Sequence, residues 1–285
     1  MIDTISDGRM ARTVVNLLWA PRALPLGAEL YATVRRRPDA IPSVAFSMHW
    51  NAMARGKLAD ATMALDDPLV PAGFRLARLQ GLHSLGFAVD PARVDRAVAE
   101  VYADTAASPL GILAAGTWGV DRGRAEEVER ARSRLRELSA RFLAAGDSLE
   151  AGSVNGTILA LDGYAAWKRG RRDEALALLE RAQREIVGLG PVAASNGAVR
   201  WWIAELLVEM DRPADAARYY ESFKGPDPYS ALRLGRIYEG LGERDKAREE
   251  YEEVLALFVD PDPELRPMVA EARQGIARLG FRPRG

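Results

Sequence analysis

A pattern of paired helices recurs along most of this chain. Each copy has an apolar run, a short turn and a second amphipathic run with a small residue, as in MHWNAMARGKLADATMAL at residues 48–65. The expected turn residues are Gly56, Gly86, Gly123, Gly170, Asp211 and Gly242, at spacings of 30 to 47 residues. Repeats of this length are typical of helical-hairpin arrays. Because one hairpin cannot bury its own apolar stripe, the pattern predicts a stack of hairpins.

The rest of the sequence also favours helices. No window shows the alternating β-branched pattern of a strand. Prolines stand where a first helical turn tolerates a missing N–H, and glycines follow many apolar runs. We therefore predict an all-α fold of about 15 helices. They are expected near residues 10–20, 25–36, 42–55, 58–66, 70–85, 91–104, 109–121, 124–144, 148–168, 172–187, 192–210, 213–223, 228–240, 244–258 and 264–279.

Charge and cysteine content narrow the possible partners. The 285 residues carry a net charge of −1, which removes the general attraction to nucleic acids and anionic membranes. The chain has no cysteine, so a reducing cytoplasm fits best. Residues 13–28 faintly resemble a secretory signal, but polar residues and a proline interrupt them, and no run reaches the ~20 apolar residues of a membrane span. We expect a cytoplasmic protein with no nucleic-acid or membrane partner.

The stretch LGRIYEGLGERDKAREEY, residues 234–251, resembles a tetratricopeptide repeat (TPR). The matching positions are Leu234 and Gly235 in the first helix, the aromatic residue Tyr238, the turn residue Gly242, the small residue Ala247 and the aromatic residue Tyr251. The resemblance is strong over residues 156–258 and weak over residues 42–145. It implies a right-handed α-solenoid of antiparallel hairpins, a TPR-like superhelix.

The quality of the resemblance divides the chain into four segments. Residues 1–41 are expected to form N-terminal helices, either a divergent repeat or a cap. Residues 42–145 would form divergent TPR-like hairpins, and residues 146–258 clearer ones. Residues 259–285 would form a charged capping helix and a tail.

The resemblance also implies that the first helix of each hairpin lines a concave groove that binds a protein or peptide. In this sequence, the residues expected on that face are Phe46, Trp50, Tyr164, Trp167, Lys168, Trp201, Glu205, Arg236 and Glu239. Aromatic side chains beside charged groups are typical of peptide-binding hot spots. The alternative is that the tryptophans only fill gaps between repeats. Arg236 and Glu239 are not required by the packing of the repeat, so we expect them to be free for a partner.

The sequence contains no recognisable catalytic or cofactor motif. His49 and His83 are the only histidines, and without cysteines they do not make a conventional zinc site. The Gly-rich phosphate-binding motifs are absent. Arginines at positions 130, 132, 134 and 136 are expected to lie on a solvated helix face. We expect no enzyme activity, no cofactor and no metal.

Three functions remain open from the sequence. The first is a non-catalytic interaction scaffold that binds a peptide or protein segment in the groove. The alternative is a regulatory or sensor region of a bacterial signalling system, because the chain resembles the helical-repeat tails of serine/threonine kinases and transcription activators. The third is a hydrolase built on a helical toroid, in which Asp162, Glu205 and Glu239 would face one cavity.

Overall fold

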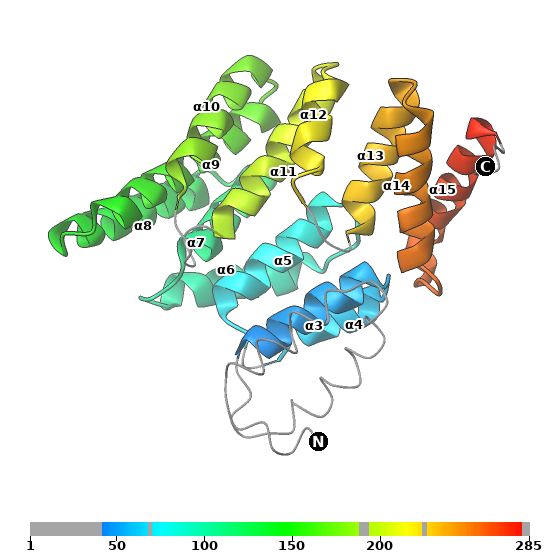
Figure 1. Cartoon of the computed structure of the whole chain (residues 1–285). Helices are drawn as coiled ribbons and strands as arrows, with labels where there is room; N and C mark the ends of the chain where they lie inside the picture. The colour runs from blue at the N-terminus through cyan, green and yellow to red at the C-terminus, as the bar shows by residue number, and fades with distance from the viewer. Residues whose placement is uncertain (1–41, 68–69, 188–193, 224–226, 281–285) are drawn as a thin grey trace, which may run out of the picture. The chain divides into compact units, whose positions relative to one another are not determined.

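The computed structural model describes residues 42–67, 70–187, 194–223 and 227–280, which form thirteen α-helices, one short 3₁₀ helix and no strand (Figure 1). The helices are α3 (Pro42–Ala54), α4 (Leu58–Ala64), α5 (Ala72–Ser84), α6 (Pro91–Ala103), α7 (Pro109–Asp121), α8 (Ala125–Ala144), α9 (Ser148–Lys168), α10 (Arg172–Glu185), α11 (Ala194–Glu209), α12 (Pro213–Tyr220), α13 (Pro228–Gly240), α14 (Arg244–Leu257), η2 (Pro263–Leu265) and α15 (Arg266–Leu279). The all-α prediction is confirmed, with helix ends within three residues of those expected. The helices expected at residues 10–20 and 25–36 lie outside the described residues.

The turn residues of the hairpins were predicted correctly. All six have a positive φ angle, from 56° at Asp211 to 89° at Gly86. At Gly170, the amide of the glycine donates to the carbonyl of Trp167 at 2.8 Å, and the next amide donates to the carbonyl of Ala166 at 3.0 Å. This pair of bonds is the Schellman motif, which satisfies the last carbonyls of a helix. A further turn of this kind, at Gly146 between α8 and α9, was not predicted.

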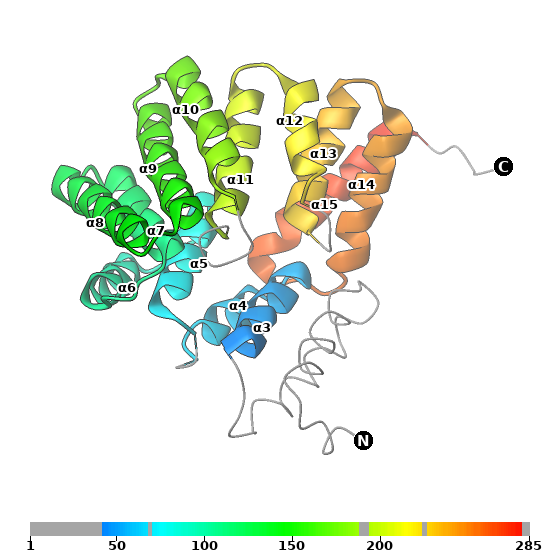
Figure 2. The same cartoon turned by 60° about the vertical axis from the view of Figure 1, so that its left-hand side comes forward.

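The contacts between residues divide the chain into two compact units. Unit 1 contains residues 1–70 and 220–285, and unit 2 contains residues 71–219. Within unit 2, neighbouring helices pack in sequence order, as predicted for an α-solenoid: α5 on α7, α7 on α8 and α9, α9 on α10, and α10 on α11. Figure 2 shows α9, α10 and α11 side by side. The right-handed superhelix and the four sequence segments stay predictions.

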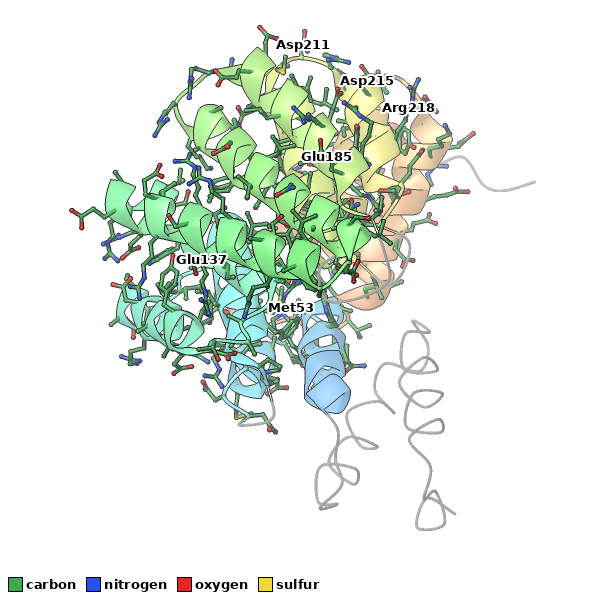
Figure 3. The ribbon with its side chains drawn as sticks, turned by 90° about the vertical axis from the view of Figure 1, so that its left-hand side faces the viewer. Met53, Glu137, Glu185, Asp211, Asp215 and Arg218 are labelled. Carbon is green, nitrogen blue, oxygen red and sulfur yellow. The ribbon has the colours of Figure 1, made fainter. Side chains whose placement is uncertain are left out.

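Unit 2 has an apolar interior and a charged outer face. Helix α7 is buried from Pro109 to Gly119, because its sequence is apolar or small on every side. The second helices of the hairpins carry charged side chains, among them exposed Glu137 and half-buried Glu185 and Asp215 (Figure 3). The arginines of α8 are less free than predicted, because Arg132 forms an ion pair with Asp162 of α9 at 2.6 Å.

Two glycines allow the first helices of neighbouring hairpins to touch in unit 2. Gly73 of α5 and Gly111 of α7 meet backbone to backbone, so a Cβ atom added to Gly111 would lie 2.5 Å from the Cα of Gly73. Real Cβ atoms do not approach other heavy atoms this closely. The close packing of α5 on α7 therefore requires glycine at this contact.

Unit 1 joins two segments that are far apart in the sequence. Helix α4 has no side-chain cap of its own; instead, Asp262 accepts a hydrogen bond from the amide of Ala59 at 3.0 Å. The amide of Asp262 donates to the carbonyl of Gly56 at 2.8 Å, and Lys57 forms an ion pair with Asp260 at 2.9 Å. We call these contacts of residues 56–59 with residues 260–262 the clasp. These contacts were not predicted from the sequence.

The last helix of unit 1, α15, packs against α13 and α14. The ring of Tyr251 on α14 is fully buried between two glycines, Gly235 of α13 and Gly275 of α15. A Cβ atom added to either glycine would lie within 2.6 Å of this ring. Tyr251 therefore holds three helices together. None of the described helices is long and apolar enough to cross a membrane.

Candidate functional site

The residues expected in the groove fall in different units. Tyr164, Trp167, Lys168, Trp201 and Glu205 belong to unit 2, whereas Trp50, Arg236 and Glu239 belong to unit 1. The side chain of Phe46 lies outside the described part of the structure. Only the five residues of unit 2, on α9 and α11, are therefore candidates for one described surface.

Trp167 occupies the C-terminal end of α9 and is half-buried. Its indole Nε1 donates a hydrogen bond to Oε2 of Glu209 on α11 at 3.0 Å. The ammonium group of Lys168 lies over the ring of Trp167, 4.7 Å from its centroid, and 5.1 Å from the ring centroid of Tyr164. A cation above aromatic faces is attracted by their quadrupoles. These contacts fix the orientation of the indole.

Tyr164 is a packing residue rather than an exposed one. Its side chain is 2% exposed, and its ring lies 4.7 Å from that of Trp202 on α11. The hydroxyl donates to Asp121 of α7 at 2.8 Å, and burial, together with this carboxylate, raises the pKa of Tyr164. Tyr164 therefore supports Trp167, with the two rings edge to face at 5.9 Å, and is itself covered.

Helix α11 supplies the other side of this surface. Trp201, Glu205 and Glu209 follow one another at four-residue spacing, so they lie along one stripe of the helix. Trp201 and Glu205 are half-buried, and Glu209 is exposed. We call Trp167, Lys168, Trp201, Glu205 and Glu209 the Trp167 surface. The sequence analysis did not select Glu209, although its spacing from Glu205 was the signal that would have found it.

The expectation that Arg236 and Glu239 are free for a partner is wrong. The guanidinium group of Arg236 forms an ion pair with Glu271 of α15. Glu239 accepts from Arg278 of α15 at 2.6 and 2.8 Å and from the hydroxyl of Tyr251 at 2.8 Å. The bonds from Arg278 hold the pKa of Glu239 below its usual value. Both residues therefore attach α15 to the preceding hairpin.

Trp50 and the histidine beside it lie on α3 of unit 1. His49 is buried, and its Nδ1 lies 3.0 Å from the carbonyl oxygen of Ala61 on α4. Its ring packs edge to face on that of half-buried Trp50, with 5.7 Å between centroids. His49 is thus a packing residue of the hairpin. A role of Trp50 in binding stays a prediction.

The acids of the hydrolase hypothesis belong to two different units, and two of the three are already paired with arginines. Asp162 and Glu205 belong to unit 2 and Glu239 to unit 1. Asp162 is paired with Arg132, and Glu239 with Arg278. Within the described ranges, no group of three or more histidine, aspartate or glutamate side chains has the arrangement of a metal site.

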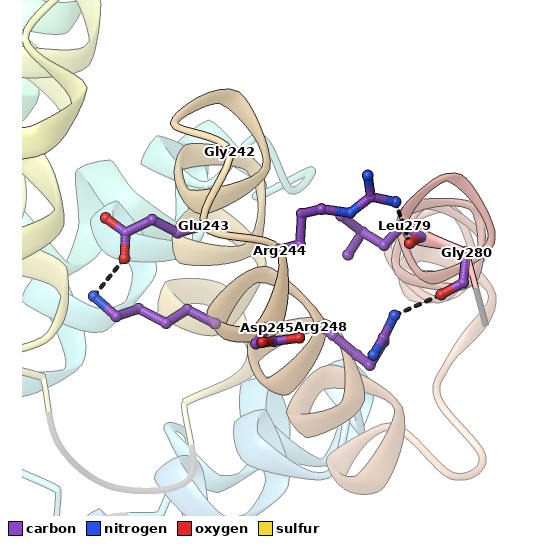
Figure 4. Close-up of a pocket in the computed structure, with 8 residues that line it drawn as sticks. Gly242, Glu243, Arg244, Asp245, Arg248, Leu279 and Gly280 are labelled. Atoms are coloured by element: carbon purple, nitrogen blue, oxygen red, sulfur yellow. Dashed lines mark hydrogen bonds and ion pairs between the residues drawn. The ribbon is translucent and has the colours of Figure 1, made fainter. Parts of the chain in front are cut away.

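A cavity of about 640 Å³ opens in unit 1 between the start of α14 and the end of α15 (Figure 4). It is lined by Gly242, Glu243, Arg244, Asp245, Lys246, Arg248, Leu279 and Gly280. Its cations already have partners: Lys246 pairs with Glu243 at 2.5 Å, Arg244 donates to the carbonyl of Leu279, and Arg248 donates to the carbonyl of Gly280. The cavity therefore has the character of a helix-capping contact.

Glu250 on α14 is a half-buried acid among other acids. Burial raises its pKa to about 7, with further contributions from the carboxylates of Glu253, Glu221 and Glu249. A raised pKa means that the folded protein holds this proton more tightly than the unfolded chain does. The resulting stability is fully present below the unfolded pKa of about 4.5 and is lost as the pH rises through about 7.

We expect the Glu250→Gln variant to lose less stability than the wild type between about pH 5 and about pH 8. The difference should be about 1 kcal/mol after allowance for solvent screening at this half-exposed site. Urea unfolding across this range measures it. Glu252→Gln, at an exposed position of the same helix, is the control. Parallel pH profiles for the wild type and Glu250→Gln would contradict the assignment.

Comparison with known proteins supports the repeat assignment. The sequence model of the tetratricopeptide repeat matches residues 229–258, which the structure forms into α13 and α14. No curated protein matches the chain. The matched hairpin and the all-helical architecture identify a TPR-like helical repeat. The match to this repeat is evidence that the protein acts, in general terms, as a protein-interaction scaffold.

Proposed function

We propose that this protein is a non-catalytic scaffold that binds a peptide or protein segment at the Trp167 surface. The TPR-like hairpin supports an interaction role, because helical-repeat proteins present extended surfaces to their partners. The proposal places the contact on α9 and α11 of unit 2. The bacterial-signalling and hydrolase alternatives have no observation of their own among the described residues and stay hypotheses.

The observation that carries the proposal is the geometry of Trp167. Its indole is half-buried and is held by Glu209, Lys168 and Tyr164 before any partner arrives. A tryptophan in a fixed orientation loses little entropy on binding, and tryptophan is enriched among interface hot spots. Trp201 on the neighbouring helix adds a second half-buried aromatic side chain to the same surface.

The test is selection from a phage-displayed library of random dodecapeptides on the purified protein. We expect the selected peptides to bind the Trp167→Ala variant at least about tenfold more weakly than the wild type, the loss typical of a hot-spot residue. Binding is measured by fluorescence anisotropy, and circular dichroism checks that the variant keeps its helices. Glu137→Ala, on the outer face of α8, should bind like the wild type.

Two results would overturn the proposal. One is a selection that enriches no peptide above a blank surface. The other is a set of peptides that bind the wild type and Trp167→Ala equally well, because the contact would then lie elsewhere.

A further inference from the structure

The acids that surround Trp167 are already engaged. Glu209 accepts the hydrogen bond of Trp167 and also lies 3.5 Å from the guanidinium group of Arg172. Asp121 accepts the hydroxyl of Tyr164. Glu205 also has an interaction of its own. Of these acids, Glu209 has a cationic partner in Arg172, and the carboxylates of Glu209 and Asp121 already accept hydrogen bonds from within the protein.

The positive charge is not balanced in the same way. Lys168 is exposed, and its ammonium group lies over the faces of Trp167 and Tyr164. Arg169, the next residue, is also exposed. In the part of the chain that the structure describes, neither cation forms an ion pair with a carboxylate. The edge of the Trp167 surface thus presents the cation of Lys168 beside a fixed indole, and the exposed cation of Arg169 follows it in the sequence.

We propose that the segment bound at the Trp167 surface is acidic: an aspartate or glutamate side chain pairs with Lys168, and an adjacent apolar or aromatic side chain packs on Trp167. This inference rests on the proposed function and names the chemistry of the partner. The position of Lys168 over two rings removes part of its hydration, which makes an ion pair with a carboxylate more favourable than at an open surface. Arg169 adds long-range attraction for an acidic segment.

Other charged partners fit this surface less well. A basic segment would meet Lys168 and Arg169 with like charge, while the nearby acids are occupied. A nucleic acid or an anionic membrane is held by many cations along an extended face, whereas two cations are available here and the whole chain carries a net charge of −1. A short acidic segment with an apolar neighbour matches both features of the site.

The experiment is a charge swap on peptides selected from the random dodecapeptide library. We expect the peptides selected by the wild type to be enriched in aspartate or glutamate next to an aromatic or aliphatic residue. Their affinity should fall about tenfold or more in Lys168→Glu. Replacing the acidic residue of the peptide by lysine should restore binding to Lys168→Glu and weaken binding to the wild type. Arg218→Glu, at a side chain that is 79% exposed on α12, makes the same charge change as a control.

The outcomes separate this inference from the proposed function. Peptides that depend on Trp167 but lack acidic residues, or that bind Lys168→Glu as well as the wild type, would overturn the acidic partner and leave the scaffold function standing. Peptides whose binding does not depend on Trp167 would overturn both the acidic partner and the proposed function. Phosphatidylserine vesicles and poly(U) are tested in parallel; Lys168-dependent binding to either, without acidic peptides, would also overturn the inference.

Discussion

Replacing Tyr251 with alanine should lower the free energy of unfolding by about 3–5 kcal/mol, the usual cost of removing a buried aromatic side chain. The side chain is fully buried, and its ring fills the space between Gly235 and Gly275. Without the ring, the space between Gly235 of α13 and Gly275 of α15 is left unfilled. We therefore expect the amides of Arg266–Leu279 to lose most of their protection from hydrogen exchange, which mass spectrometry measures.

The control is Tyr251→Phe, which keeps the ring and removes only the hydrogen bond to Glu239. This variant should cost about 1 kcal/mol and leave the protection of α15 nearly unchanged. If α15 in Tyr251→Ala stayed as protected as in the wild type, the ion pairs of Arg236 and Glu239 would be sufficient to hold it. That result would contradict the conclusion that the ring of Tyr251 holds the three helices together.

Replacing Gly111 with alanine should destabilise the protein by about 2–3 kcal/mol, although alanine is the better helix former. The added methyl group would lie 2.5 Å from the Cα of Gly73, and a backbone atom has no rotamer by which to move away. Helices α5 and α7 must therefore separate. Urea unfolding measures the loss.

A glycine with free space around it provides the matched control. Gly81 also lies in α5, and nothing lies within 4 Å of a Cβ atom added there. Gly81→Ala should therefore stabilise the protein by up to about 1 kcal/mol through helix propensity alone. Equal effects of Gly81→Ala and Gly111→Ala would show that the backbone contact of α5 and α7 does not limit the stability.

Local features of the fold were predictable because their causes lie within a few residues. A helix that must end in a left-handed residue is recognised from a glycine after an apolar run, and even Asp211 was identified from its place in the repeat. The same reasoning located the matched hairpin at residues 229–258. Gly146 was missed because it joins two hairpins, where the repeat pattern gives no fixed position.

The candidate site was less predictable because its geometry depends on distant residues. Tyr164 and Trp167 are one helical turn apart on α9, so their spacing in the sequence places them on the same face of the helix. Trp202 of α11 packs on the ring of Tyr164 and Asp121 of α7 accepts its hydroxyl, so Tyr164 is covered, whereas Trp167 stays half-buried. Arg236 and Glu239 were likewise assigned from one hairpin alone, whereas their partners lie 35 and 39 residues later on α15.

The clasp has a consequence for the order in which the protein is completed during synthesis. Helix α4 is made early, but the carboxylate that caps it belongs to Asp262, 203 residues later. Unit 2 is complete when residue 219 has left the ribosome, whereas unit 1 must wait for residues 260–262. Because domains generally fold as units as the chain emerges, unit 2 should be the first to fold, and helix α4 among the last parts to be stabilised.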